Sequence, residues 1–148
     1  MVGIDPQRSE DEPKNSASEI LRLCKACTLA TIEDGAPWAT SMFFANEALT
    51  IYLILEKSGK SMANIKSNPR VALAIDDRVP NRFVQIGGVA EVLEGSAAEK
   101  GRQIVYDKLP EYRSFFEAVP TCVVKVRPKV IYVSDMARGW FPARTINL

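Results

Sequence analysis

The apolar residues of this chain gather in short runs separated by polar turns, which is typical of β-strands rather than of long helices. Asp34-Gly35 stands between two such runs and predicts a hairpin, because this pair readily adopts the positive-φ conformation of tight hairpin turns. Residues 46–48 form a second tight connection. The runs predicted to form strands cover residues 28–33, 37–45, 49–55, 71–76, 83–94 and 122–133.

Capping patterns predict helices around these strands. Ser16 and Glu19 form a capping box that opens a helix to about Lys25, preceded by a flexible N-terminal tail at residues 1–15. Residues 96–99 form a second capping box, which opens a helix to about residue 108, and Pro110 starts a further short helix. The apolar stripe expected on the first helix is Ile20, Leu23, Cys24 and Cys27.

Two features predict that the sheet is strongly bent. Gly87 and Gly88 interrupt one strand, and paired glycines mark a bulge or bend of the kind that barrels use at their corners. Pro128 lies inside the last strand and requires an edge or a bulge. Six strands joined mainly by short turns, without the alternating crossover helices of a parallel sheet, predict a mainly β (α+β) fold. We therefore expect a six-stranded antiparallel barrel with peripheral helices.

Composition limits the class of protein. The 148 residues, 47% apolar and 25% charged, match one globular domain, which we place at residues 16–148. A net charge of +1 disfavours nucleic acid as a partner. No apolar run approaches the roughly 18 residues of a membrane span, and the polar N-terminus is unlike a signal peptide. We expect a cytoplasmic protein, and the three cysteines then indicate free thiols.

The chain contains no histidine, which excludes Ser-His-Asp and Cys-His nucleophile systems. Cys24 and Cys27 have CxxC spacing, but Cys122 alone remains as a further thiol, so no metal site is predicted. A dithiol redox pair is one interpretation of Cys24 and Cys27. Burial of both as small hydrophobic residues of the helix is the favoured one.

The turn after the third strand has the composition of an anion site. Lys57, Ser58, Lys60 and Ser61 lie where a strand ends and a short helix begins. Unpaired N–H groups at a helix start and ammonium groups both favour a bound anion, which predicts the phosphate of a small molecule. The alternative is a solvated turn in which Ser58 or Ser61 acts only as an N-cap.

The order of these segments resembles the pyridoxamine 5′-phosphate oxidase-like, FMN-binding split-barrel superfamily. The resemblance rests on residues 28–44, residues 57–73 and the Gly-Gly-Val-Ala-Glu-Val stretch at 87–92, and extends from about Ser18 to Trp140. It implies a six-stranded Greek-key split barrel and a homodimer with two FMN molecules at the subunit interface. The tail at 136–144 lacks the Arg-Leu-His motif of the true oxidase, so vitamin B6 chemistry is not expected.

The resemblance also implies a set of cofactor-binding residues. The turn and the following helix would bind the FMN phosphate, the second strand would line the ring, and two residues would come from the partner subunit. One arginine that relatives carry in the second strand is replaced here by Thr40. The phosphate residues are Lys57, Ser58, Lys60, Ser61 and Asn64, the ring residues are Thr40, Ser41, Met42 and Phe43, and the partner residues are Gln85 and Trp140.

Two functions follow from this assignment. The first is an FMN-dependent oxidoreductase that passes electrons from NAD(P)H to an unidentified small-molecule acceptor, without a catalytic side chain. The alternative is a non-catalytic flavin-binding or ligand-sensing module, or a dimeric scaffold without cofactor. Trp38, Phe43 and Phe44 are expected in the core or in a dimer contact. Tyr106, Tyr112, Phe115 and Phe116 are expected on helices that cover one end of the barrel, where they could also shape a substrate pocket.

Overall fold

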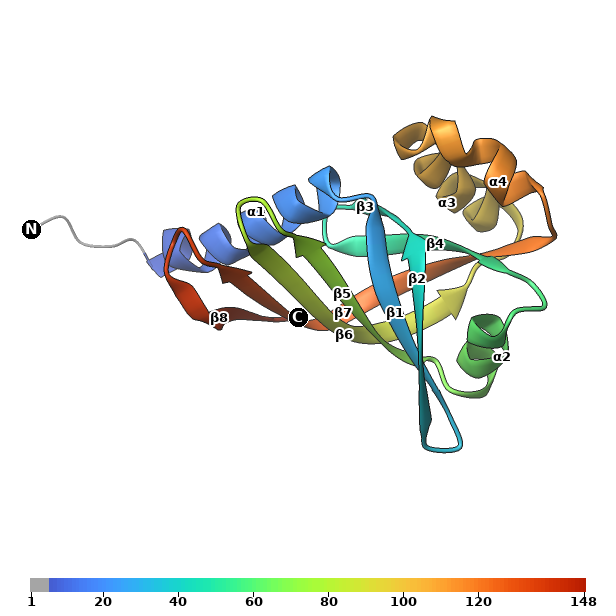
Figure 1. The fold of residues 1–148 in the computed structure, drawn as a ribbon, viewed down its shortest axis with the longest axis horizontal. Helices are drawn as coiled ribbons and strands as arrows, with labels where there is room; N and C mark the ends of the chain where they lie inside the picture. The colour runs from blue at the N-terminus through green and yellow to red at the C-terminus, as the bar shows by residue number, and fades with distance from the viewer. Residues whose placement is uncertain (1–5) are drawn as a thin grey trace, which may run out of the picture.

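The structure is a computed structural model that describes residues 6–148, with side chains from residue 11 onward. One antiparallel sheet of eight strands and four α-helices make up this part of the chain (Figure 1). The strands are β1 (Ala26–Glu33), β2 (Ala36–Phe43), β3 (Ala45–Glu47), β4 (Thr50–Glu56), β5 (Arg70–Asp77), β6 (Arg82–Val92), β7 (Thr121–Asp135) and β8 (Trp140–Asn147). The helices are α1 (Pro6–Leu23), α2 (Lys60–Ser67), α3 (Gly95–Lys108) and α4 (Arg113–Glu117), with a 3-10 turn η1 (Pro110–Tyr112).

The strand order explains the curled shape of the sheet. It runs β2-β1-β5-β6-β7-β4-β3, and β8 also pairs with β7. The first part of the long strand β7 pairs with β4 and its last part with β8, while β6 follows its other side. Because β4 lies beside β7 rather than beside β5, the strands β4 to β7 have the Greek-key arrangement. The predicted mainly β split-barrel fold is confirmed, with eight strands in place of six.

The glycine pair marks a bulge, as predicted. Gly87 pairs with Val130 and Gly88 with Pro128, so the extra residue is Lys129 in β7. A Cβ atom added at Gly88 would lie 2.5 Å from the carbonyl oxygen of Arg127, so only glycine allows this approach of the two backbones. The bulge also accommodates Pro128, whose ring nitrogen cannot donate to the ladder.

Two apolar clusters fill the fold. The larger lies within the curl of the sheet, where α1 contributes Ile20 and Leu21. The smaller joins α3, η1 and α4 to the outer side of β3, β4 and the start of β7, with Leu109 fully buried at its centre. Figure 1 shows α3 and α4 together at the end of the sheet opposite to β8. This confirms that aromatic helices cover one end of the barrel.

The N-terminal helix begins earlier than predicted. It starts at Pro6 instead of Ser16, so residues 6–15 of the predicted tail are helical, and residues 1–5 lie outside the described residues. Pro6 is compatible with the first helical position, where its missing N–H has no intrahelical partner. The buried face includes Pro13, Ser16 and Ala17, small residues that a search for large apolar side chains overlooks. Ser16 therefore lies inside the helix and does not cap it.

The predicted apolar stripe of that helix is wrong in its second half. The helix ends at Leu23, which is half-exposed, and Cys27 belongs to β1, where strand alternation buries it. The predicted long strand at 37–45 is divided at Phe44 into β2 and β3. The last strand, β8, was not predicted because Pro142 interrupts its apolar pattern. Pro142 is tolerated because β8 pairs only with β7 and so lies at an edge.

None of the helices within residues 6–148 is long and apolar enough to cross a membrane.

Candidate functional site

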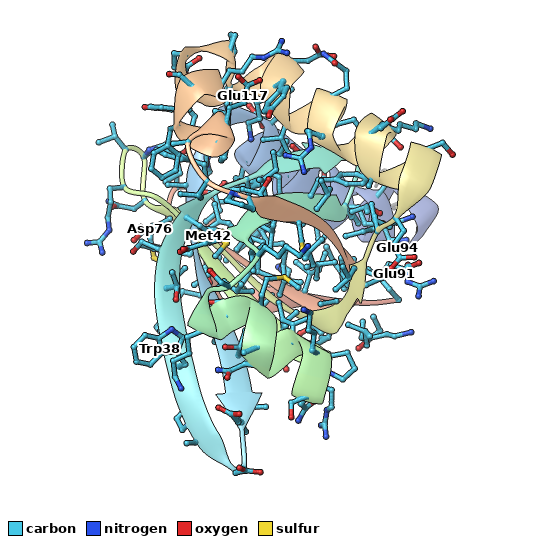
Figure 2. The ribbon with its side chains drawn as sticks, turned by 90° about the vertical axis from the view of Figure 1, so that its right-hand side faces the viewer. Trp38, Met42, Asp76, Glu91, Glu94 and Glu117 are labelled. Atoms are coloured by element: carbon cyan, nitrogen blue, oxygen red, sulfur yellow. The ribbon has the colours of Figure 1, made fainter. Side chains whose placement is uncertain are left out.

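A cavity of about 560 Å³ lies between β2, the end of β4, the start of α2, and α4 with the loop that follows it. Figure 2 looks toward this side: Met42 lies on β2 between α4 above and α2 below, and Trp38 lies further along the same strand. Six of the eleven predicted cofactor residues line the cavity, namely Thr40, Ser41, Met42, Phe43, Lys60 and Ser61. The cavity has a polar end at α2 and an apolar end at α4.

The polar end is built from the first turn of α2 and the facing strand. Gly59 is the N-cap residue, so no side chain caps the N–H groups of this turn. The hydroxyl oxygens of Thr40 and Ser61 are 3.1 Å apart. Two hydroxyl groups and the helix N-terminus thus meet at one place, and they offer several hydrogen-bond donors to an anionic group.

Lys60 brings a positive charge to this end, and a carboxylate accompanies it. Its Nζ atom lies 3.7 Å from Oε2 of Glu33, the last residue of β1, and 5.3 Å from the centroid of the Trp38 ring. Both members of the ion pair are about half-exposed. An exposed ion pair of this kind contributes little to the stability of the fold.

The apolar end is formed by aromatic side chains from β2 and α4. Phe43 stacks on Tyr112 of η1 with ring centroids 4.0 Å apart and an interplanar angle of 16°. Phe115 and Phe116 meet the same ring edge-on, at 6.1 Å and 6.3 Å. Phe115 is 64% exposed, which leaves a large apolar surface open to a ligand. Only Glu56 and Lys60 carry charge among the residues that line the cavity.

The remaining predicted residues do not line the cavity. Lys57 and Ser58 lie in the turn between β4 and α2, where the Lys57 backbone N–H donates to the carbonyl of Pro120 at 2.9 Å. Asn64 is fully buried against β1 instead of facing the anion site. Gln85 lies on the exposed outer face of β6, and Trp140 is 7% exposed in the main core. The last two were assigned to a neighbouring subunit's site, and that assignment stays a prediction.

Two features in or beside the cavity were not assigned to the cofactor site from the sequence. Phe115, Phe116 and Val119 line it through a contact between segments about 70 residues apart, for which the sequence had no local signal. Glu33 reaches Lys60 because α2 packs against β1. A carboxylate at the end of a strand, directly before a turn, has no pattern that separates it from an ordinary surface charge.

The cysteines lie outside this cavity. Burial raises the pKa of the Cys27 thiol to about 12, and burial followed by the Asp77 charge raises the pKa of Cys24. Reactive thiols require the opposite shift, which disfavours the dithiol interpretation. Among the side chains of residues 11–148, no group of Cys, Asp and Glu residues is arranged to hold a metal ion.

A partly buried lysine stands near these thiols. Lys108 Nζ donates to the carbonyl oxygens of Leu21 (2.8 Å) and Cys24 (2.6 Å) at the end of α1, and lies 4.1 Å from the centroid of the Phe44 ring. These contacts favour the ammonium form, but burial outweighs them and lowers the pKa of Lys108 to about 8. The residue joins α3 to α1 and has no contact with the cavity lining.

Comparisons with known proteins agree with the fold. The sequence model of the pyridoxamine 5′-phosphate oxidase family matches residues 14–134. General stress protein 26 of Bacillus subtilis (strain 168) is 23% identical over 126 residues, which cover 83% of this chain and 89% of that protein. A FAD-binding protein from Mesorhizobium loti superposes with a TM-score of 0.71 at 20% identity, over 80% of this chain and 90% of that chain. A heme binding protein from Mycobacterium smegmatis gives a TM-score of 0.74 at 20% identity, over 98% of this chain and 60% of that chain.

Proposed function

This chain belongs to the pyridoxamine 5′-phosphate oxidase family, and on that basis we propose that it binds FMN in the cavity between β2 and α2. The observation that carries the proposal is the polarity of the cavity. Its polar end joins an uncapped helix N-terminus, two hydroxyl groups and Lys60, and its other end is aromatic. FMN has the same division, with a phosphate at one end and a planar ring at the other.

The residues present fit this cofactor. Lys60, Ser61 and the N–H groups of the first turn of α2 would bind the phosphate, with Thr40 beside them. Met42 and Phe43 on β2 would contact the ring, with Phe115 across the cavity. Lys57 and Ser58 stay at the mouth of this end, where they would add electrostatic attraction without direct contact. A bound flavin would supply reversible electron transfer, which none of the residues that line the cavity offers.

We propose further that the flavin accepts electrons from NAD(P)H and passes them to a small-molecule acceptor. Support comes from the chemistry of the lining, where only Glu56 and Lys60 are charged. The chain would thus position the cofactor, exclude water at the aromatic end and leave the chemistry to the ring. Because the lining holds so few charged groups, an acceptor that needs no proton from the protein is favoured.

The outer face of the sheet is a candidate contact between two copies of the chain. The outer face of the sheet carries a row of exposed residues in register across four strands, namely Thr28, Ala74, Gln85 and Tyr132. The uncharged side chains of this row let two such faces approach without charge repulsion, and the row includes the predicted partner residue Gln85. We propose that a homodimer forms through this face. Trp140 is buried in its own subunit, so this proposal does not use it.

The alternative is a protein that binds flavin without catalysis, and the small number of charged groups in the cavity lining is compatible with it. Reduction experiments separate the two. The purified protein is mixed with FMN, separated from free FMN and treated with NADH or NADPH without oxygen. Bleaching of the yellow colour, faster than with free FMN, supports the oxidoreductase. A yellow protein that neither donor bleaches indicates the binding module, and a colourless protein refutes flavin binding.

A haem group fits the cavity less well. The chain has no histidine, the usual axial ligand of haem in such proteins, so the histidine that haem-binding relatives use is missing.

A further inference from the structure

The ammonium group in the proposed phosphate site already has a counter-ion within the chain. Lys60 Nζ lies 3.7 Å from Glu33 Oε2. Glu33 is the last residue of β1, directly before the turn of the β1–β2 hairpin. A phosphate that binds Lys60 must therefore replace Glu33 or share the ammonium group with it. In either case a fixed negative charge remains near the bound anion.

Glu33 is held in this place by buried groups. Asn64 on α2 is fully buried, and Thr31 on β1 is 3% exposed. The Asn64 amide can be oriented so that its oxygen faces a donor and its nitrogen faces an acceptor. In this orientation the oxygen accepts from Thr31 Oγ1 at 3.0 Å, and the nitrogen donates to Glu33 Oε2 at 3.1 Å. The same nitrogen is 3.3 Å from the backbone oxygen of Lys60. A buried amide with defined partners fixes the carboxylate more firmly than a surface ion pair does.

The site consequently has no net positive charge. Lys60 is offset by Glu33, Thr40 is neutral, and Glu56 adds a second carboxylate to the cavity lining. The hydroxyl groups of Thr40 and Ser61 and the N–H groups of α2 remain as donors, but none of them carries a full charge. The aromatic end has no such offset, because its contacts are with neutral rings.

We infer that Glu33 cancels most of the affinity that the phosphate group would otherwise add, so that this chain selects the ring and side chain of a flavin and discriminates little between riboflavin and FMN. The flavin is then a ligand that exchanges rather than a permanently bound group. This inference rests on the proposed flavin site and specifies its ligand class. It assigns Glu33 as the residue that sets phosphate selectivity, held in position by Asn64.

Fluorescence titration of riboflavin and of FMN tests the inference, with the ratio of the two dissociation constants as the readout. We expect the wild-type protein to bind FMN less than about tenfold more tightly than riboflavin, which is below the contribution of one uncompensated charged contact. Glu33→Gln should raise the affinity for FMN about tenfold and change that for riboflavin less than about twofold. The glutamine keeps an oxygen that can accept from Asn64, so the fold is preserved.

Asp34→Asn is the matched control. It removes the same charge at the next residue, and asparagine tolerates the positive φ of 50° at this position. The ratio should stay within about twofold of wild type, because an exposed charge outside the ion pair is screened by solvent. Circular dichroism and the thermal midpoint verify that both variants are folded.

Three outcomes would overturn the inference. These are a wild-type preference for FMN of about a hundredfold or more, an unchanged ratio in Glu33→Gln, and an equal effect of Asp34→Asn. In each case the flavin site itself would stand, since both ligands bind. Failure of every variant to bind either flavin would instead refute the proposed function and, with it, this inference.

Discussion

Thr40 on β2 and Ser61 on α2 bring their hydroxyl oxygens to 3.1 Å from each other across the polar end of the cavity. This contact joins the β1–β2 hairpin, which extends beyond the rest of the sheet (Figure 1), to the helix whose N-terminus faces the cavity. The strand that would line the flavin ring and the turn that would bind its phosphate are therefore held in one geometry.

Lys60→Ala should weaken FMN binding. Loss of one charge-assisted hydrogen bond costs about 1.5 to 3 kcal/mol, which is roughly tenfold to a hundredfold in affinity. Because Glu33 already offsets Lys60, we expect the lower end, about tenfold. Flavin fluorescence titration measures the change. Lys57→Ala is the control, since Lys57 does not line the cavity, and its effect should stay below about threefold. Unchanged affinity in Lys60→Ala would remove Lys60 from the site.

Gly88→Ala should destabilise the fold strongly. The added Cβ would lie 2.5 Å from the Arg127 carbonyl oxygen, which is backbone and cannot move away without disturbing the bulge. Overpacking of this kind costs about 1 to 3 kcal/mol, and we expect about 2 kcal/mol or more in the free energy of unfolding, measured with urea.

Gly87→Ala provides the comparison at the neighbouring position. Its added Cβ would meet only a side-chain methyl of Val130 at 3.3 Å, so the cost should stay below about 1 kcal/mol. Equal losses in the two variants would show that the backbone approach at Gly88 is not the cause.

Ala74→Arg should dissociate the proposed homodimer. Ala74 lies in the exposed row between Thr28 and Gln85, and an arginine on each subunit would place like charges against each other. Sedimentation velocity should show a dimer for wild type and a monomer for the variant. Ala97→Arg makes the same change at an exposed position on α3, and it should remain dimeric. A monomeric wild type would refute the dimer outright.

Lys108 should make stability rise with pH in one window. Burial lowers its pKa from 10.5 to about 8, so between these values the unfolded chain holds a proton that the folded chain has lost. Stability therefore increases as pH rises from 8 toward 10.5, by an amount on the order of 1 kcal/mol once its partial exposure is allowed for.

The measurement is the difference in unfolding free energy between wild type and Lys108→Met across that window. Cys27 acts in the opposite direction, because its pKa is raised from 9.0 to about 12 and the unfolded chain loses the thiol proton first. Lys108 also lowers the pKa values of Cys24 and Cys27, so both proteins are compared in a Cys24→Ala, Cys27→Ala background that removes the two thiols. A difference that does not change with pH would show that Lys108 keeps its ordinary pKa.

Local chemistry made most of the sheet predictable from sequence. The Asp-Gly hairpin and the glycine-pair bulge each depend on residues adjacent in the chain, and both are present. The turn at Lys60 and Ser61 was found for the same reason, since its signal lies within six residues. The true length of α1 was not predictable in this way, because packing of small residues against the sheet outweighs the low helix propensity of Pro13.

The rest of the cavity depends on contacts between distant segments. Phe43 meets Tyr112 and Glu33 meets Lys60 only after the sheet has curled and the helices have packed on it. Asn64 illustrates the limit: helical spacing placed it one turn beyond Ser61, but the side on which α2 packs decides whether it faces the cavity or the core. A periodic pattern gives the relative angle of two residues on a helix and not the direction in which the helix is turned.

The two tryptophans of the chain occupy opposite environments, Trp38 at the rim of the cavity with 44% of its surface exposed and Trp140 in the core with 7%. Their intrinsic emission therefore separates into two optical signals. Trp38 lines the cavity, so direct contact with a bound ring should quench its emission most strongly, while Trp140 should shift to longer wavelength when the fold opens. Single Trp→Phe replacements would give one protein that reports occupancy and another that reports unfolding, without any attached dye.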